Sequence, residues 1–497
     1  MISRRGLLAG TAALGAGAAL GAVAAPALAR MASGAAAADG LAPDAPTRRL
    51  SLFAGEMDAP LLGPGKPLTK RFCAYNGTPL MSWRAPQGTR LLVDFENRLP
   101  SATTVHWHGI RTQNAFDGVA PLTQKATPAG GTFHYEVPLL DAGFYFIHPH
   151  CDETGQVGRG LAGLLIVDDP KETAVFDLEH VVVVKDWRLG EDGQWLAPMS
   201  TDDGASTAGT FGTVRATNAS TTPARVEAPA HGDVRVRLLV ADSTRIIDFG
   251  SDAKDMALIA CDGHALPPVH FDDLPDGVWR MGPAMRVDAH LRMPGPGEEA
   301  KLYDYRSAEP YLLATFVGVE AGQKAARPFR PQALRPCAAP QADLAHARTF
   351  DFTVQTAAGP TTLAPPLPDD DPLAKALVSS FCVGAKTFWA INRTSWAAGD
   401  DLRLPPPLAR LNDGESCVFS MFNATKHAHP MHLHGHVFKV LSSNRKPKLP
   451  HFYGDTVLVE PNETVEIAFR AARGDWVFHC HILEHMDTGM MGWLEIA

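Results

Sequence analysis

Histidine is the residue type whose spacing in this chain points most directly to chemistry. The chain has 20 histidines, and ten of them fall in four short clusters: His106 and His108; His148 and His150; His429, His432 and His434; and His479, His481 and His485. Side chains at positions i and i+2 of a strand point to the same face, so both imidazoles of an H-x-H pair can reach one metal ion. A single histidine is more often a hydrogen-bonded core or surface residue, whereas four such clusters predict a metal centre.

A cysteine in the last cluster helps to decide which metal is expected. Zinc would be the first choice for several histidines with one cysteine. However, His429, Cys480 and His485 supply two imidazoles and one thiolate, which together with a weak thioether form the ligand set of a blue-copper centre. Met490, five residues beyond His485, is placed to supply the thioether, although it could instead be a core residue. A structural zinc site would not need ten histidines, so the donor set favours copper.

The run His479-Cys480-His481 also predicts how two metal sites are connected. On an extended strand, the side chain of Cys480 points one way and those of its two neighbours point the other way. A metal bound by Cys480 is then joined to metals bound by His479 and His481 through a short covalent path, on the order of 10 Å. Such a path is suited to the transfer of single electrons.

The elements that must position these clusters form an internal repeat. Two stretches share the pattern Asn, Gly, Asn, H-x-H-G: Asn76, Gly88, Asn97 and His106–Gly109 in one, and Asn392, Gly414, Asn423 and His432–Gly435 in the other. In both, the H-x-H-G motif begins nine residues after the second asparagine. A third copy, with Asn218 and Gly232, leads into the strand-like Val234–Leu238 and has no H-x-H. We therefore expect three homologous β domains, of which the first and last hold the metal ligands.

Short β-rich runs separated by turn residues recur along the chain, a pattern typical of β-sandwiches. They include Arg90–Phe95, Gly163–Val167, His180–Val184 and Thr464–Phe469. Domain boundaries are expected near Asp168–Pro170 and in the proline-rich stretch Pro328–Pro340. The compositions of Thr201–Thr222 and Leu363–Pro372 predict flexible loops.

The first 29 residues are predicted to be an export signal. Arg4 and Arg5 precede a mildly apolar run that ends at Ala27–Ala29, which is typical of a twin-arginine signal; a plain secretory signal or an uncleaved anchor is the alternative. We expect the twin-arginine export machinery to deliver the protein to the periplasm or outside the cell. Beyond this segment no stretch of about 18 apolar residues occurs, so no membrane span is expected in the mature chain. A net charge of −9 without a Lys/Arg run argues against nucleic-acid binding.

All four motifs occur in order over nearly the whole mature chain, and in this the sequence resembles the multicopper oxidases of the three-cupredoxin, laccase-like type. The resemblance implies an all-β fold of three cupredoxin-like Greek-key β-sandwich domains, at residues 48–170, 171–335 and 345–497. The middle domain lacks copper ligands and is expected to serve mainly as a spacer and wall. The resemblance also implies four copper ions: a type 1 copper on His429, Cys480, His485 and Met490; a type 2 copper on His106 and His432; and a type 3 pair on His108, His148, His150, His434, His479 and His481.

The function implied by the resemblance is a laccase-like oxidase. It would couple the one-electron oxidation of phenolic or aromatic amine donors to the four-electron reduction of dioxygen to water. The alternative is a cuprous-ion oxidase that protects the periplasm from copper. Relatives with that role often carry a methionine-rich insertion, whereas the 14 methionines here are scattered, with Met281, Met285 and Met293 nearest to a cluster.

Two further classes are disfavoured by the same residues. A cupredoxin scaffold without enzymatic activity would have lost its copper ligands, but here every clustered histidine, Cys480 and Met490 are present. A copper nitrite reductase does not place its thiolate between two histidines that bind a cluster.

Cys480 and Asp117 are the residues expected to take part in catalysis. Asp117, nine residues after His108, matches an acid that such enzymes use to shuttle protons, although an Asp-Gly turn alone would also explain it. Many bacterial relatives carry a carboxylate directly after the last type 1 histidine, where this chain has Met486. Glu484 and Asp487 are near in sequence, but the direction of their side chains is not predicted.

Two residues beside the ligands are expected not to bind metal. His436 is interpreted as a structural or supporting residue, and Cys151 as a small buried residue. The chain has seven cysteines, whose spacing matches no disulfide framework, so no pairing is predicted.

Overall fold

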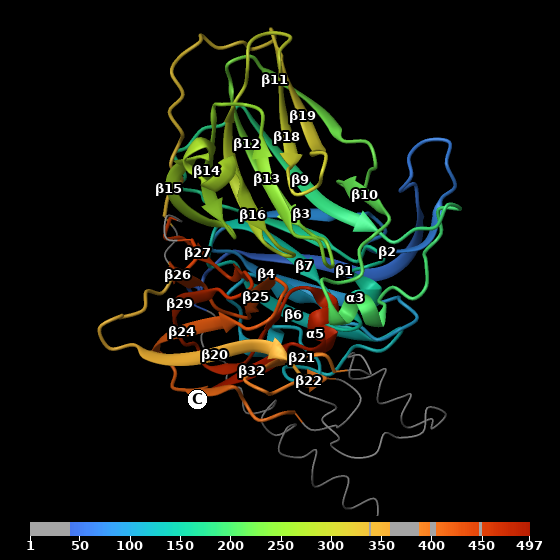
Figure 1. Cartoon of the computed structure of the whole chain (residues 1–497), viewed down its shortest axis with the longest axis vertical. Helices are drawn as coiled ribbons and strands as arrows, with labels where there is room; N and C mark the ends of the chain where they lie inside the picture. The colour runs from blue at the N-terminus through green and yellow to red at the C-terminus, as the bar shows by residue number, and fades with distance from the viewer. Residues whose placement is uncertain (1–39, 337–338, 358–386, 398–403, 447–449) are drawn as a thin grey trace, which may run out of the picture. The chain divides into compact units, whose positions relative to one another are not determined.

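The computed structural model describes residues 40–336, 339–357, 387–397, 404–446 and 450–497. Leu41–Ala497 form one compact unit, and its described residues are almost all β (Figure 1). None of its described helices is long and apolar enough to cross a membrane. The predicted signal at residues 1–29 and the predicted loop Leu363–Pro372 lie outside the described residues.

Residues 47–168 supply two sheets that share one hydrophobic core. The first sheet, in the order β2-β1-β4-β6, contains β1 (Thr47–Ala59), β2 (Thr69–Tyr75), β4 (Arg90–Asn97) and β6 (Thr132–Pro138). The second, in the order β3-β8-β7-β5, contains β3 (Met81–Pro86), β5 (His106–His108), β7 (Gly143–His148) and β8 (Gly163–Asp168). The connections hold η1 (Asn114–Phe116) and α2 (Glu153–Gln156). Phe95 of the first sheet and Trp107 and Ile147 of the second belong to one core, which fixes β5 and β7.

Residues 178–319 supply another two sheets. One, in the order β10-β9-β12-β17-β14-β15, contains β9 (Leu178–Trp187), β10 (Val214–Thr217), β12 (Asp233–Val240), β14 (Met256–Cys261), β15 (His264–His270) and β17 (Arg286–Arg292). The other, in the order β11-β19-β18-β13-β16, contains β11 (Ala224–Pro229), β13 (Ile247–Ser251), β16 (Trp279–Met281), β18 (Glu299–Asp304) and β19 (Tyr311–Val319). Three short helices complete this stretch: α3 (Asp202–Ser206), η2 (Phe271–Asp273) and η3 (Pro275–Gly277).

Residues 348–496 form the last group of sheets. One, in the order β21-β20-β24-β29-β26-β27, contains β20 (Arg348–Thr356), β21 (Trp389–Ile391), β24 (Ser416–Asn423), β26 (Phe438–Ser443), β27 (Tyr453–Gly454) and β29 (Thr464–Arg470). The next, in the order β23-β32-β30-β25-β28, contains β23 (Ala409–Leu411), β25 (His429–Leu433), β28 (Thr456–Val459), β30 (Gly474–Cys480) and β32 (Met491–Ile496). β22 (Trp396–Ala397) pairs with β31 (Thr488–Gly489), and α5 (Leu483–Asp487) follows β30.

The predicted repeat is visible as one turn built three times. Asn76, Asn218 and Asn392 have positive φ angles of 49°, 50° and 50°. Each side-chain oxygen accepts a hydrogen bond from a strand N–H, and each side-chain amide donates to the carbonyl two residues earlier in that strand: Phe53 and Ser51, Val183 and Val181, and Thr353 and Asp351. Asparagine tolerates this left-handed backbone better than most residues do. The three asparagines chosen from the sequence therefore occupy equivalent positions.

The expectation of a loop over Thr201–Thr222 is wrong, because this stretch contains α3 and β10. The Thr201 hydroxyl accepts a hydrogen bond from the N–H of Gly204 at 3.0 Å, so a threonine of an apparently loop-like sequence is in fact a helix N-cap. β10 pairs antiparallel with β9. Figure 1 shows α3 beside α5, the helix that carries His485.

Candidate metal centre

Eight of the ten clustered histidines come together from two pairs of antiparallel strands. β5 pairs with β7 so that His106 lies opposite His148, and β25 pairs with β30 so that His432 lies opposite His479. Of the other four, His108 ends β5, and three follow a strand by one or two residues: His150, His434 and His481. All eight are buried, the most exposed being His150 at 5%. The H-x-H spacing thus places both imidazoles of each pair toward the same interior region.

The nitrogens of these histidines converge in small groups. His106, His432 and His434 form one group with ligand atoms within 4.8 Å of one another, and His150, His434 and His479 form another. The Nε2 atom of His148 lies 3.4 Å from Nδ1 of His108 and 3.4 Å from Nε2 of His481. The Nε2 atoms of His434 and His479 are 3.0 Å apart.

Several imidazoles are held so that one nitrogen faces the cluster without a partner. Nδ1 of His106 donates to the carbonyl of Asp117, and Nδ1 of His432 donates to the carbonyl of Asp455, both at 2.8 Å. The Nε2 atoms of His106, His150 and His432 are buried and have no hydrogen-bond partner among the described residues. An outward N–H donor fixes the tautomer and leaves the inward nitrogen as a lone-pair ligand. The unpaired nitrogens therefore fit a site built for metal.

Burial also sets the charge state of the cluster. Loss of solvent lowers the pKa of His108, His148 and His150 well below the ordinary value, and the neighbouring imidazoles lower it further. The same holds for His432 and His434. These rings stay neutral at physiological pH, and the neutral ring is the form that binds metal.

A second group of ligand atoms surrounds the sulfur of Cys480. Sγ is buried and lies 3.5 Å from Nδ1 of His429 and 3.7 Å from Nδ1 of His485, and these two nitrogens are 3.1 Å apart. Their outer nitrogens are occupied: Nε2 of His429 bonds the Thr425 hydroxyl at 2.7 Å, and Nε2 of His485 donates to the Thr207 carbonyl at 2.8 Å. Two imidazoles and one thiol therefore converge on one point.

Met490 lies beside this group. It is fully buried and belongs to the same hydrophobic core as Cys480. The N–H of Cys480 donates to the Met490 carbonyl at 3.0 Å, and the N–H of Met490 donates to the His485 carbonyl at 2.8 Å. The chain from His485 to Met490 therefore folds back onto the backbone of Cys480.

The two groups are connected through three consecutive residues. The sulfur of Cys480 faces His429 and His485, whereas the imidazoles of His479 and His481 belong to the eight-histidine cluster. Nδ1 of His479 also donates to the Cys480 carbonyl at 2.8 Å. This geometry agrees with the alternation of side chains expected of an extended strand. His479 and His481 are joined directly to Cys480 by peptide bonds.

Asp117 contacts two histidines of the cluster. Its Oδ2 lies 2.9 Å from Nδ1 of His434, and its carbonyl accepts the N–H of His106. The side chain is 1% exposed. Asp117 is therefore more than a surface turn residue, although it also precedes the positive-φ Gly118.

The two residues expected not to bind metal are both engaged elsewhere. Nδ1 of His436 donates to the His434 carbonyl at 2.8 Å, and Nε2 accepts the N–H of Ala472 at 2.9 Å, so neither nitrogen is available. Cys151 is buried, as expected, but it is disulfide-bonded, which the sequence did not predict.

Glu484 and Asp487, the two acids near His485, both hydrogen-bond threonine residues. Glu484 accepts hydrogen bonds from the N–H and the hydroxyl of Thr210, the latter at 2.6 Å. Asp487 accepts the Thr154 hydroxyl at 2.5 Å, and burial raises its pKa to about 7. Met486, at the position where relatives carry an acid, packs into an apolar cluster that includes Val119.

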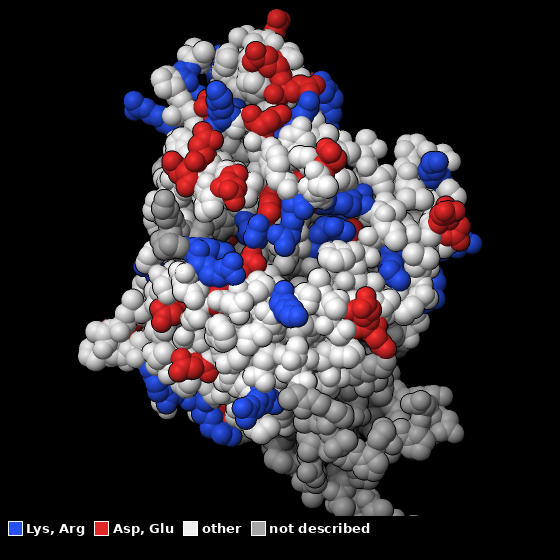
Figure 2. Space-filling model, viewed as in Figure 1, with Lys and Arg blue, Asp and Glu red and all other residues white. Residues whose placement is uncertain are grey.

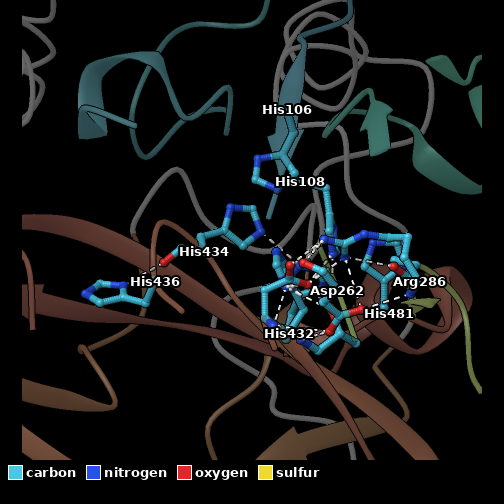
Figure 3. A network of polar contacts seen from close by, with 12 residues as sticks. His106, His108, Asp262, Arg286, His432, His434, His436 and His481 are labelled. Carbon is cyan, nitrogen blue, oxygen red and sulfur yellow. Dashed lines mark hydrogen bonds and ion pairs between the residues drawn. The ribbon is translucent and has the colours of Figure 1, made fainter. Parts of the chain in front are cut away.

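Sequence reasoning missed a buried network behind two of the histidines. Oδ1 of Asp455 lies 2.9 Å from Nε2 of His108, and the Asp455 carbonyl holds His432. The guanidinium of Arg286 binds both carboxylate oxygens of Asp455, at 2.9 and 2.6 Å, and its Nη1 lies 3.5 Å from Oδ1 of Asp262 (Figure 3). Arg286 begins β17, so the stretch expected to be mainly a spacer contributes directly to this centre.

Glu153 was also missed. Its carboxylate lies 3.1 Å from Nδ1 of His150 and 3.7 Å from Nδ1 of His148, and burial raises its pKa well above the ordinary value. The signal was present in the sequence, because Glu153 follows His150 by three residues. For Asp455 no local signal existed, since 347 residues separate it from His108.

The two parts of the chain that contain the histidine clusters also match a known protein family. Two models of the multicopper oxidase family match residues 63–172 and 384–497. A solved multi-copper oxidase from Pseudomonas Thermotolerans is 31% identical, with 91% of this chain and 100% of that chain covered and a TM-score of 0.78. Multicopper oxidase MmcO of Mycobacterium tuberculosis is 29% identical over 86% of this chain and 83% of its own length. An L-ascorbate oxidase of Brassica rapa is 25% identical, covering 84% and 87%.

Proposed function

The chain belongs to the multicopper oxidase family, whose enzymes use copper to pass electrons from a reducing substrate to dioxygen, and from this premise we propose that it is a laccase-like oxidase. It couples the one-electron oxidation of phenolic or aromatic amine donors to the four-electron reduction of dioxygen to water. One observation carries the proposal. The buried thiol of Cys480 faces two imidazoles, while the residues on either side of it face a cluster of eight.

The donor atoms fit four copper ions. The soft sulfur of Cys480, with His429, His485 and the thioether of Met490, would hold the type 1 ion. The type 2 ion would be held by His106 and His432, whose inward nitrogens are unpaired. The remaining six imidazoles would hold the type 3 pair: His108, His148 and His481 on one ion, and His150, His434 and His479 on the other. Bound copper supplies one-electron redox chemistry, accepting electrons singly and delivering four to dioxygen.

The chain's own residues orient the ligands and exclude water. Thr425 and the Thr207 carbonyl hold the outer nitrogens of His429 and His485, so both rings keep Nδ1 toward the sulfur. The Trp389 ring packs against His485 with 4.5 Å between ring centroids. These contacts hold a buried, preorganised ligand set, which would limit rearrangement of the ligands when the charge of a bound copper changes.

Asp117 is proposed to supply protons to the reduction of dioxygen. In Asp117→Asn the side-chain oxygen can still accept the His434 N–H, but an amide cannot take up and release a proton as a carboxylate does. We expect turnover to fall by about 10- to 100-fold with copper content unchanged. Oxygen-electrode rates and metal analysis would check this, with the exposed Asp413→Asn as control. Unchanged turnover would remove Asp117 from proton delivery.

The organisation of the chain is proposed on the same basis. Three stretches each supply two large sheets, and each contains the asparagine turn, which supports cupredoxin domains at 48–170, 171–335 and 345–497. A twin-arginine signal at 1–29 would direct the protein to the periplasm or the exterior. Export by this route carries folded proteins, so copper could be bound before export.

Copper stoichiometry and the fate of oxygen test the proposal. The loaded protein is expected to bind about four copper ions per chain and to consume one dioxygen for every four electrons taken from a methoxyphenol. Metal analysis, an oxygen electrode and a peroxide assay would measure this, and removal of copper by a chelator is expected to abolish turnover. Retention of zinc in place of copper, or release of one peroxide per dioxygen, would contradict the assignment.

The methionines do not strengthen the alternative of a cuprous-ion oxidase. Met281, Met285 and Met293 are each 5% exposed or less and belong to the hydrophobic core. Sδ of Met285 accepts the N–H of Gly282 at 3.2 Å. Thioethers that are buried in this way are not presented to an incoming metal ion, which supports an organic donor.

A further inference from the structure

The imidazole of His485, one of the two proposed for the type 1 site, is closed to direct contact with an electron donor. His485 is fully buried, and its outer nitrogen is bonded to the Thr207 carbonyl in the segment that follows α3. Trp389 covers the ring and is itself held by a hydrogen bond from Nε1 to the Ala205 carbonyl at 2.6 Å. An electron donor must therefore bind next to His485 without touching its imidazole ring.

A hollow of about 340 Å³ lies next to the same ligand set. Lys426, His427 and Ala428 form part of its wall and run directly into His429, the other type 1 imidazole, while Ile482 follows His481. The opposite wall comes from the 178–319 stretch, including the segment 244–246 and the turn 304–307 after β18. This volume suits one substituted aromatic ring.

The charges that this hollow presents to solvent are cationic. Lys426 and Arg306 are exposed, and Arg245 is half-buried. Among the described residues Lys426 forms no salt bridge, whereas Nη1 of Arg306 lies 3.8 Å from Oδ2 of Asp248. Figure 2 shows Lys and Arg side chains gathered around a hollow in the middle of the face in view.

The two acids in the wall are already neutralised. Asp304 accepts Nη2 of Arg215 at 2.7 Å and the N–H groups of Asp248 and Arg306 at 2.9 Å. Glu460 accepts Nη1 of Arg280 at 3.1 Å. Arg245 is also paired, because its Nη2 binds Oδ2 of Asp186 at 2.9 Å. Lys426 is therefore the cation of the wall that keeps an uncompensated charge among the described residues, and it favours an anionic group there.

One side of the hollow offers an apolar platform. Phe211 is 44% exposed, an unusual position for a large aromatic side chain, and the Arg245 guanidinium lies 4.9 Å from its ring centroid. Ile246 and Ile482 add apolar surface. A ring stacked on Phe211 would place a ring substituent among the cations.

We propose that this hollow is the donor site and that it selects aromatic donors bearing a carboxylate, held by Lys426 with Arg306. The inference rests on the proposed oxidase function and names its substrate class. It also separates the two candidate oxidase functions, because cationic side chains repel a copper(I) ion and the described residues of the wall include no methionine. Phenols with an acid group are the expected donors.

A matched pair of donors tests the proposal on the copper-loaded enzyme. The probes are 4-hydroxy-3-methoxybenzoate and its methyl ester, which differ in charge but share the oxidisable phenol. Lys426→Met is expected to raise KM for the acid by about tenfold and to leave KM for the ester unchanged. Lys254→Met, which removes an exposed lysine outside the hollow, is the control and is expected to alter neither. Raising the salt concentration should weaken the preference for the acid.

A binding measurement separates failure of this inference from failure of the proposed function. Calorimetry with 4-methoxybenzoate, which has no free phenol, should detect binding that Lys426→Met weakens by about tenfold. If the enzyme oxidises both phenols with equal KM and Lys426→Met changes neither, the donor-site proposal is wrong while the oxidase function stands. If neither phenol is oxidised but 4-methoxybenzoate binding still depends on Lys426, the anion site stands and the laccase-like function fails. If 4-methoxybenzoate does not bind and the enzyme shows no preference for the acid over the ester, the proposed donor site is wrong.

Discussion

Replacement of Cys480 by serine is expected to abolish the blue colour of the protein and to lower dioxygen consumption by at least about 10³-fold. The sulfur is the one soft donor placed between His429 and His485, and the absorption at about 600 nm expected of this site requires a thiolate on copper. Serine is close in size, so the buried strand can keep its packing. The eight-histidine cluster is untouched, and copper content is therefore expected to fall from about four ions to about three.

Visible absorption, metal analysis and an oxygen electrode measure these outcomes on the same sample. Cys417→Ser provides a matched control, because Cys417 is also a buried free cysteine in the 348–496 stretch, but its Sγ lies 3.8 Å from the Glu415 carbonyl and belongs to none of the groups of described residues that could hold a metal. The control should keep both colour and activity. Continued oxygen consumption by Cys480→Ser would mean that electrons reach the histidine cluster by another path.

The grouping of these histidines with one another and with Cys480 could be predicted from the sequence because local spacing encodes it. An H-x-H pair on a strand needs only the two-residue period to bring both imidazoles to one face, and His479-Cys480-His481 needs the same period to separate the thiol from its neighbours. The asparagine turns are encoded locally too, because asparagine tolerates the left-handed backbone and its side-chain amide supplies the hydrogen bonds of the turn. For this reason the positions of Asn76 and Asn392 in the repeat are enough to identify them as equivalent.

The contacts that support the ligands could not be predicted, because they join residues that are far apart in the chain. Asp455 reaches His108 only after the sheets of 47–168 and 348–496 have packed together. The carbonyl of Thr207 meets His485 across 278 residues. Nothing in the sequence around Thr207 or Arg286 indicates a metal centre. Thr207 lies in the stretch Thr201–Thr222, whose composition predicted a loop. These residues are fixed by tertiary packing, which short motifs do not describe.

The stretch 178–319 is consequently more than a spacer. Its segment after α3 covers the outer nitrogen of His485, and its Arg286 lies between two buried carboxylates, one of which contacts His108. The first contact holds the outer nitrogen of His485, and the second holds Asp455, the acid that contacts His108. The middle stretch therefore helps to orient these histidines.

Arg286→Met is expected to destabilise the folded protein by about 3–5 kcal/mol and to reduce the copper that it retains. Arg286 is 1% exposed and neutralises Asp455 and Asp262, and the pKa of Asp262 is already raised by burial and by the Asp455 charge. Without the guanidinium, at least one carboxyl must take up a proton in the folded state. The folded variant then binds a proton that the unfolded chain does not bind at pH 7, so its stability should fall further as the pH rises.

Chemical unfolding at pH 6 and pH 8, followed by metal analysis, checks this prediction. Arg280→Met is the matched control: Arg280 also binds two acids, Asp248 and Glu460, but its side chain is 39% exposed, and its loss should cost less than about 1 kcal/mol. A double variant, Arg286→Met with Asp455→Leu, removes both charges and should recover part of the stability, yet it leaves Nε2 of His108 without its carboxylate. If the double variant regained full copper content, orientation by Asp455 would be unnecessary, and equal stability of the two single arginine variants would refute the buried network's role in folding.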